Sequence, residues 1–215
     1  GGADAGRLRA WTYTSRENRT LRVSDCADPA GTIESLFPGH DEPRIYIEHR
    51  EEIPQEELAR LADGTFRALP PPGAEEVLIF FKIYDPRIPD KMAPLIYLGN
   101  GVFNTKTNTG HDLLKRIREL ISKTAKVKVP ANANLKLLEV IHAEMVNQIA
   151  LDSTLNELEL ISGDIIVAQK SEYTDEEKTS FHSPETLKDF LDYRMQRREV
   201  TFYPLGAAAA AAAAA

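Results

Sequence analysis

The stretch Val77-Leu78-Ile79-Phe80-Phe81-Lys82-Ile83-Tyr84 decides the fold, and Asp85-Pro86 ends it. It is a nearly continuous run of β-forming apolar residues, which is typical of a strand buried in the middle of a sheet. A second strand-like stretch runs from Leu95 to Phe103 and contains Asn100-Gly101. Asn-Gly alone predicts a tight hairpin turn, but the halves on either side are short, so a bulge within one strand is an equal alternative.

A helix is predicted after these strands. Thr109-Gly110-His111-Asp112 has the spacing of a capping box, in which Thr109 accepts a backbone donor and Asp112 lies three residues further on. The apolar residues that follow recur at helical spacing and form one stripe. They are Leu113, Leu114, Ile117, Leu120 and Ile121.

Three further elements complete this part of the chain. Residues 135–141 are strand-like, residues 152–158 predict a short turn of helix, and residues 164–168 predict a final strand. The resulting order is strand, strand, helix, strand, short helix, strand. One helix lying across a mixed sheet satisfies this order, so the sequence predicts an α+β fold with a β-grasp arrangement.

The regions before and after this unit have weaker patterns. Residues 8–23 predict two strands around a polar turn and residues 44–48 a third, which are too few for a core without a further covering element. Residues 51–60 are helix-prone, and the proline-rich residues 69–73 predict a linker. After an acidic loop at 175–177, Ser183-Pro184 predicts a helix start with Ser183 as its cap, and residues 199–203 predict a strand.

Composition limits the classes of function. The chain has 215 residues, 42% of them hydrophobic, and a formal net charge of −7, so its natural partners should be basic rather than nucleic acid or anionic membrane. Its single cysteine, Cys26, cannot form an internal disulfide, which fits a reducing compartment. No apolar run approaches the roughly 18 residues of a membrane helix. Residues 207–215 are all alanine and indicate a trace of unassigned side chains.

The residue types used in catalysis and metal binding show no matching pattern. Cys26 lies in a loop broken by proline and glycine, and neither His40 nor His49 has a catalytic motif beside it. The five histidines are scattered, so no metal site and no cofactor is expected. Residues 106–128 hold seven basic and two acidic residues without aromatics, which predicts a solvated helix face rather than a nucleic-acid surface. Trp11 is expected in a core, or at a seam with a neighbouring unit.

Two octapeptides carry a family resemblance, residues 79–86 (IFFKIYDP) and residues 163–170 (GDIIVAQK). They resemble the ubiquitin-like region of the HAUSP-type (herpesvirus-associated) ubiquitin-specific proteases, and the Trp11 and Phe190 segments are also similar to that region. The resemblance implies one bulged strand through Asn100-Gly101. It divides the chain into the closing part of a first ubiquitin-like domain (7–52), a linker (53–74), a second ubiquitin-like domain (75–172), and a linker helix with the first strand of a third (173–206).

The resemblance also implies a function. The family's enzyme is a thiol peptidase that removes ubiquitin from proteins, with its catalytic core outside these units, in the nucleus and the cytoplasm. The units dock substrates, ubiquitin ligases and nuclear regulators through Lys/Arg-rich segments. The matching acidic stretch contains no basic residue, and the expected partner-binding residues are Asp152, Glu157, Glu159 and Asp164.

Two other interpretations of this stretch stay open. The acidic residues can form a solvated loop without a partner. The units can also be spacers that set the distance between the catalytic core and later activating domains. Leu158 and Ser162 stand where the family carries aspartates, so the acidic surface is thinner in this chain.

Overall fold

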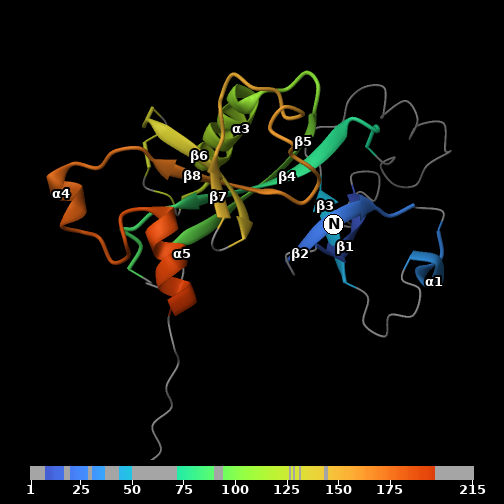
Figure 1. Ribbon diagram of the computed structural model, residues 1–215, viewed down its shortest axis with the longest axis horizontal. Helices are drawn as coiled ribbons and strands as arrows, with labels where there is room; N and C mark the ends of the chain where they lie inside the picture. Colours follow the sequence, from blue (N-terminus) through green and yellow to red (C-terminus); the bar gives the residue numbers. More distant parts are fainter. Residues whose placement is uncertain are drawn as a thin grey trace, which may run out of the picture.

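The computed structural model describes residues 8–16, 20–28, 31–36, 44–49, 72–89, 94–125, 127, 129–130, 132–142 and 145–196. These residues form two sheets (Figure 1). The smaller has three antiparallel strands in the order β2-β1-β3. Its strands are β1 (Leu8–Ser15), β2 (Leu21–Cys26) and β3 (Ile45–His49), which confirms the three strands predicted for this region.

The larger sheet has five strands in the order β5-β4-β8-β6-β7. The apolar run becomes β4 (Glu76–Tyr84), which pairs antiparallel with β5 (Leu95–Asn104) and parallel with β8 (Ile165–Lys170). On the far side of β8 lie β6 (Leu135–His142) and the edge strand β7 (Met145–Gln148). The predicted central strand therefore has a hydrogen-bonded neighbour on each side, as its near-continuous hydrophobicity requires.

The stretch around Asn100-Gly101 is one strand. Both residues lie in β5 opposite β4, and the register shifts where Phe81 pairs with Gly99 and Lys82 pairs with Tyr97. The extra residue is therefore Leu98, two positions before Asn100. Gly99 has a φ of +144°, which a side-chain-bearing residue rarely adopts. The bulged-strand alternative is confirmed and the hairpin alternative is wrong.

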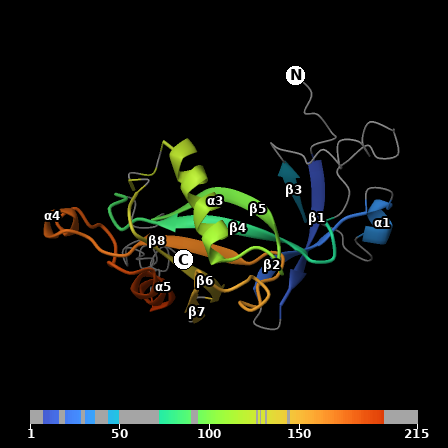
Figure 2. The same ribbon diagram turned by 90° about the horizontal axis from the view of Figure 1, so that it is seen from above.

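Helix α3 (Gly110–Lys123) lies across one face of the larger sheet (Figure 2). The carboxylate of Asp112 accepts a hydrogen bond from the backbone N–H of Thr109 at 2.9 Å, as the capping-box pattern predicts. The apolar stripe of the helix packs onto β4, where Ile79, Phe81 and Ile83 are fully buried. This core defines an α+β arrangement of one helix on a mixed sheet.

Several elements differ from the predictions. Strand β7 was not predicted, because a four-residue edge strand with two apolar side chains shows no clear alternation. Residues 152–158 form hydrogen-bonded turns instead of helix. Two short helices, α1 (Ile33–Leu36) and α4 (Asp175–Lys178), lie in segments expected to be loops. Four-residue helices are too short to produce a periodic signal.

The last helix begins later than expected. Helix α5 spans Leu187–Gln196, and the hydroxyl of Thr186, rather than that of Ser183, accepts a hydrogen bond from the backbone N–H of Asp189 at 3.1 Å. The carbonyl of Pro184 instead accepts a hydrogen bond from the Tyr84 hydroxyl. Phe190 packs on Tyr84 with ring centroids 5.4 Å apart, so α5 covers the face of β4 opposite α3.

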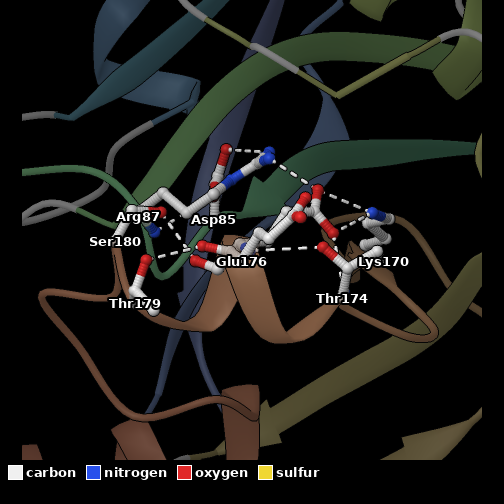
Figure 3. A network of polar contacts seen from close by, with 8 residues as sticks. Asp85, Arg87, Lys170, Thr174, Glu176, Thr179 and Ser180 are labelled. Atoms are coloured by element: carbon white, nitrogen blue, oxygen red, sulfur yellow. Dashed lines mark hydrogen bonds and ion pairs between the residues drawn. The ribbon is translucent and has the colours of Figure 1, made fainter.

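A polar network holds α4 against the end of β4 (Figure 3). The Arg87 guanidinium lies 2.8 Å from Asp85 and 2.9 Å from Glu177, and the Lys170 ammonium lies 2.6 Å from the same Glu177 carboxylate. The backbone N–H of Thr174 donates to Glu177 at 2.9 Å. These bonds connect β4, β8 and α4, so the chain after β8 is fixed to the sheet.

Other predictions fall outside the described residues. They are the helix at 51–60, the strand at 199–203 and the polyalanine trace at 207–215. The tandem repetition of β-grasp units and the domain boundaries also stay predictions. Among the described residues, no helix is long and apolar enough to cross a membrane.

Candidate partner-docking site

The acidic stretch, residues 152–164, is a loop that leads into β8. Hydrogen bonds and buried side chains attach it to the larger unit, which consists of the five-stranded sheet and α3. The backbone N–H groups of Leu155 and Asn156 donate to the carbonyls of Asn108 and Thr105 at 3.1 and 2.8 Å. The Leu155 and Leu160 side chains are buried in the main core. These backbone hydrogen bonds and the two buried leucines hold the loop in one conformation. The exposed side chains of the loop therefore project from a rigid backbone.

Glu157 and Glu159 are exposed on this loop. The Glu157 carboxylate accepts from the backbone N–H of Thr154 at 2.8 Å, and the Glu157 N–H donates to the Thr154 hydroxyl at 3.2 Å. This reciprocal bond orients Glu157 while leaving it open to solvent. Glu159 has a φ of +57°, a left-handed conformation that costs a non-glycine residue about 1 kcal/mol or more.

Asp152 lies at the start of the loop. Its carboxylate is fully exposed and lies 3.1 Å from the Nε2 atom of His111, which is also exposed. An exposed pair of this kind contributes little to stability because water competes for both groups. Asp152 is therefore available to an incoming cation.

Asp164 does not share this exposure, which corrects the predicted contact role. Its carboxylate is only 4% exposed and lies 2.7 Å from a guanidinium nitrogen of Arg16. The other carboxylate oxygen accepts from the backbone N–H of Ile161 at 2.8 Å. A second Arg16 nitrogen donates to the Ser162 carbonyl at 3.2 Å. Asp164 thus binds the smaller sheet and shapes the loop instead of facing a partner.

Ser162 and Gly163 also lie at this contact between the two sheets, which we call the junction. The Ser162 hydroxyl accepts from the backbone N–H of Leu78 at 3.1 Å, and the Gly163 N–H donates to the Leu78 carbonyl at 2.8 Å. A Cβ on Gly163 would lie 2.0 Å from the Val23 carbonyl oxygen. Glycine at this position therefore permits the close approach of β2.

The two sheets share a buried cluster. Trp11 and Val23 of the smaller sheet pack against Leu78 of β4, and all three are almost completely buried. The Trp11 indole N–H donates to the Glu48 carboxylate at 2.8 Å. The Arg22 guanidinium donates to the carbonyls of Val140 and Ile141 at 3.1 and 3.0 Å. Trp11 is both a core residue and part of the seam, which were the two roles expected for it.

Two features of this site could not be predicted from the sequence. Ile161 is 54% exposed and presents an apolar side chain beside the carboxylates. Arg16 lies 148 positions before the carboxylate that it binds. No local pattern signals a pair so distant in the chain, although Arg16 does lie in the polar turn after β1.

The remaining chemical candidates give no support for catalysis. Burial raises the pKa of the Cys26 thiol to about 11, which disfavours the thiolate that a nucleophile needs. Within the described ranges, no group of three or more His, Cys, Asp or Glu side chains could hold a metal ion. On α3, Lys115 is exposed, as expected for a solvated helix face, whereas Arg118 is half-buried and donates to the Ala133 carbonyl at 3.1 Å.

The model of one protein family, described as the ICP0-binding domain of Ubiquitin-specific protease 7, matches residues 8–213. A comparison with curated proteins finds no match. The matched residues include both sheets, the acidic loop and α5.

Proposed function

Because the chain belongs to the family of the ICP0-binding domain of Ubiquitin-specific protease 7, we propose that it is a partner-docking segment of a deubiquitinating thiol peptidase. In this proposal it consists of tandem β-grasp, ubiquitin-like units, and the catalytic core lies elsewhere in the same polypeptide. The family's description names a protein ligand, so protein segments are the class of partner that we assign to this chain.

The observation that carries the proposal is the set of exposed carboxylates on a rigid loop. Asp152, Glu157 and Glu159 are exposed, and residues 152–164 contain no basic residue to neutralise them. Carboxylates held in this way form charge-assisted hydrogen bonds with lysine and arginine side chains. Such charges increase the association rate and the selectivity for basic segments, and salt weakens them. The exposed Ile161 adds an apolar contact for the aliphatic part of a lysine or arginine side chain.

The mechanism is recruitment. Binding a Lys/Arg-rich segment of a substrate, a ubiquitin ligase or a nuclear regulator raises the effective concentration of that protein near the catalytic core. We place this activity in the nucleus and the cytoplasm. No cofactor, nucleic acid or membrane takes part in it.

A second candidate function is that of a rigid spacer, and the junction between the sheets favours it. The buried cluster of Trp11, Val23 and Leu78 and the Arg16–Asp164 ion pair hold the two sheets in one relative orientation. A spacer of fixed geometry would set the distance between the catalytic core and later activating domains. This function needs no peptide ligand.

Binding of a fluorescently labelled Lys/Arg-rich peptide to the whole chain, across a series of salt concentrations, tests the docking function. The test variant is Asp152→Asn/Glu157→Gln/Glu159→Gln, in which glutamine at 157 can still accept the Thr154 hydrogen bond. The matched control is Glu119→Gln/Glu172→Gln/Glu176→Gln, which removes the same charge from exposed residues elsewhere.

Salt-sensitive binding that the test variant loses and the control keeps would support docking at the loop. Equal binding by both variants would move the site to another surface. If the wild-type chain binds no basic peptide at any salt concentration, the docking proposal is wrong and the spacer function remains.

A further inference from the structure

The two faces of β4 have different surroundings. Ile79, Phe81 and Ile83 point into the core beneath α3. On the opposite face, Leu78 and Phe80 pack with the smaller sheet, and Tyr84 lies beneath α5. Lys82 is on this second face, between the part that the smaller sheet covers and the part that α5 covers. It is the single charged residue in an otherwise apolar run (VLIFFKIY).

A groove lies over this uncovered part of the sheet. Its volume is about 240 Å³, and Phe80, Lys82 and Ile165 line it from the larger sheet. From the smaller sheet the lining includes Tyr13, Leu21 and Arg22. The groove is therefore built by both units and exists only in the relative orientation that the junction fixes.

Aromatic rings form one side of the groove. The Tyr46 ring meets Phe80 edge-on with centroids 5.0 Å apart, and Phe80 lies 6.5 Å from the ring of Tyr97. Tyr13, Leu21 and Tyr97 are all more than one-third exposed. Exposed aromatic and aliphatic side chains gathered around a hollow are typical of a protein-binding surface rather than of an inert one.

The charges at the groove all have one sign. Among the described residues that line it, the charged ones are Lys82 and Arg22, and none is a carboxylate. Burial lowers the pKa of the Lys82 ammonium, and the nearby cations Arg22 and Arg194 lower it further. Within the described part of the chain, no hydrogen bond or ion pair engages this ammonium. A half-buried cation that is surrounded by other cations and lacks an internal partner is stabilised by an external carboxylate.

From these observations we propose that the groove binds a peptide segment of a partner protein that carries an aspartate or glutamate beside an aromatic or long aliphatic side chain. The carboxylate pairs with Lys82 and Arg22, and the apolar side chain packs against Tyr97 and Leu21. A volume of about 240 Å³ accommodates one or two side chains rather than a cofactor. This surface adjoins the end of the acidic loop at Gly163, but it uses different side chains and selects the opposite charge.

A single-stranded nucleic acid is the competing class of ligand, since cations with aromatic rings also bind stacked bases. The observations favour a peptide. The chain carries a net charge of −7, and the acidic loop ends at Gly163, which itself lines the groove. The exposed carboxylates of that loop would repel a long polyanion such as a nucleic acid. A single carboxylate of a peptide would contact only the cations of the groove, Lys82 and Arg22.

The test is a titration of the whole ¹⁵N-labelled chain, followed by NMR, with an acetylated peptide Gly-Glu-Phe-Asp-Leu-Gly. A matched peptide has glutamine and asparagine at the acidic positions, and a third titration uses an oligothymidine. We expect saturable shifts of groove amides with the acidic peptide only. Lys82→Gln should weaken its binding about tenfold, as for the loss of one charge pair. Tyr97→Ser should weaken it as well.

A second variant separates binding from folding. Lys82→Met places an apolar side chain in the half-buried position, so it should raise the urea midpoint of unfolding while weakening binding of the acidic peptide about tenfold, as Lys82→Gln does. The variant Asp152→Asn/Glu157→Gln/Glu159→Gln should bind the acidic peptide like the wild type, which separates this proposal from the docking of basic segments.

Three results would overturn the proposal. One is the absence of groove shifts at millimolar acidic peptide, as would occur if another part of the same chain fills the groove. Another is equal binding of the acidic and the amide peptide, or of wild type and Lys82→Gln. The third is tighter binding of the oligothymidine than of the peptide, which would assign the groove to nucleic acid.

Discussion

The Arg16 guanidinium and the Asp164 carboxylate lie 2.7 Å apart across the junction of the two sheets. Arg16 follows β1 of the smaller sheet, and Asp164 precedes β8 of the larger one. The carboxylate is 4% exposed and the guanidinium 19%, so water screens this pair less than an ordinary surface pair. The acidic loop thus already holds one arginine, supplied by the chain itself.

Arg16→Ala is predicted to destabilise the chain. It leaves the buried Asp164 carboxylate without its guanidinium partner, which should lower the free energy of unfolding by about 2–3 kcal/mol. The control Glu119→Ala removes one member of an exposed pair with Arg116 and should cost less than about 0.5 kcal/mol. Urea unfolding of both variants measures the difference. Equal losses would mean that the junction pair contributes no more than a surface pair.

Gly163→Ala is predicted to disturb the junction by a steric route. The backbone at Gly163 has a φ of +91°, and an added Cβ would lie 2.0 Å from the Val23 carbonyl oxygen. Backbone strain and displacement of β2 together should cost at least about 2 kcal/mol. Gly73→Ala is the control, because its Cβ would meet only the flexible Glu76 side chain at 3.6 Å. Thermal unfolding followed by circular dichroism should separate the two variants, and similar midpoints would contradict the assigned packing.

The sequence predicted most of the larger unit because its signals are local. The apolar run of β4, the capping box at Thr109 and the helical stripe of α3 each depend on residues within about four positions of one another, where spacing reports structure directly. Strand β7 and the start of α5 were missed because short edge strands and competing caps give weak or ambiguous local signals.

The candidate site was predicted less well, because it depends on contacts between residues that are distant in the chain. The exposure of Glu157 and Glu159 follows from the composition of the loop, but the burial of Asp164 depends on Arg16, which is distant in the chain. Likewise, no pattern along the chain indicates that Lys82 faces a gap between two covering elements. The burial of a side chain and its pairing with a residue of another sheet are tertiary properties. Patterns within short sequence segments do not indicate them.

The two sheets are predicted to unfold together. Trp11 is the single tryptophan of the chain, so its fluorescence reports on the smaller sheet. It packs on Leu78 of the larger sheet in a shared buried cluster. Fluorescence and far-ultraviolet circular dichroism should therefore give coincident urea transitions.

Leu113→Ala is the sharper form of this test. Leu113 is a residue of α3 and is fully buried in the core between this helix and the larger sheet, a different cluster from that of Trp11. The substitution should cost about 2–5 kcal/mol and, with cooperative unfolding, should shift the Trp11 transition by the same amount as the circular dichroism. An unchanged Trp11 transition would show that the smaller sheet unfolds independently.

The contribution of Glu177 is predicted to depend on pH. The Lys170 ammonium, and then the Thr174 backbone N–H, hold the pKa of the Glu177 carboxyl below its ordinary value. A carboxyl with a lowered folded-state pKa contributes stability that is present above its unfolded-state pKa, about 4.3, and that is lost as the pH falls through the folded-state pKa. The difference in unfolding free energy between wild type and Glu177→Gln should therefore be constant from about pH 7 to 5 and shrink below about pH 4. Glu176→Gln removes the same charge from the adjacent exposed residue and is the matched control for charge alone. A Glu177→Gln difference that stays constant through the acid range would show that the network in Figure 3 stabilises the neutral side chain as well as the ionised one.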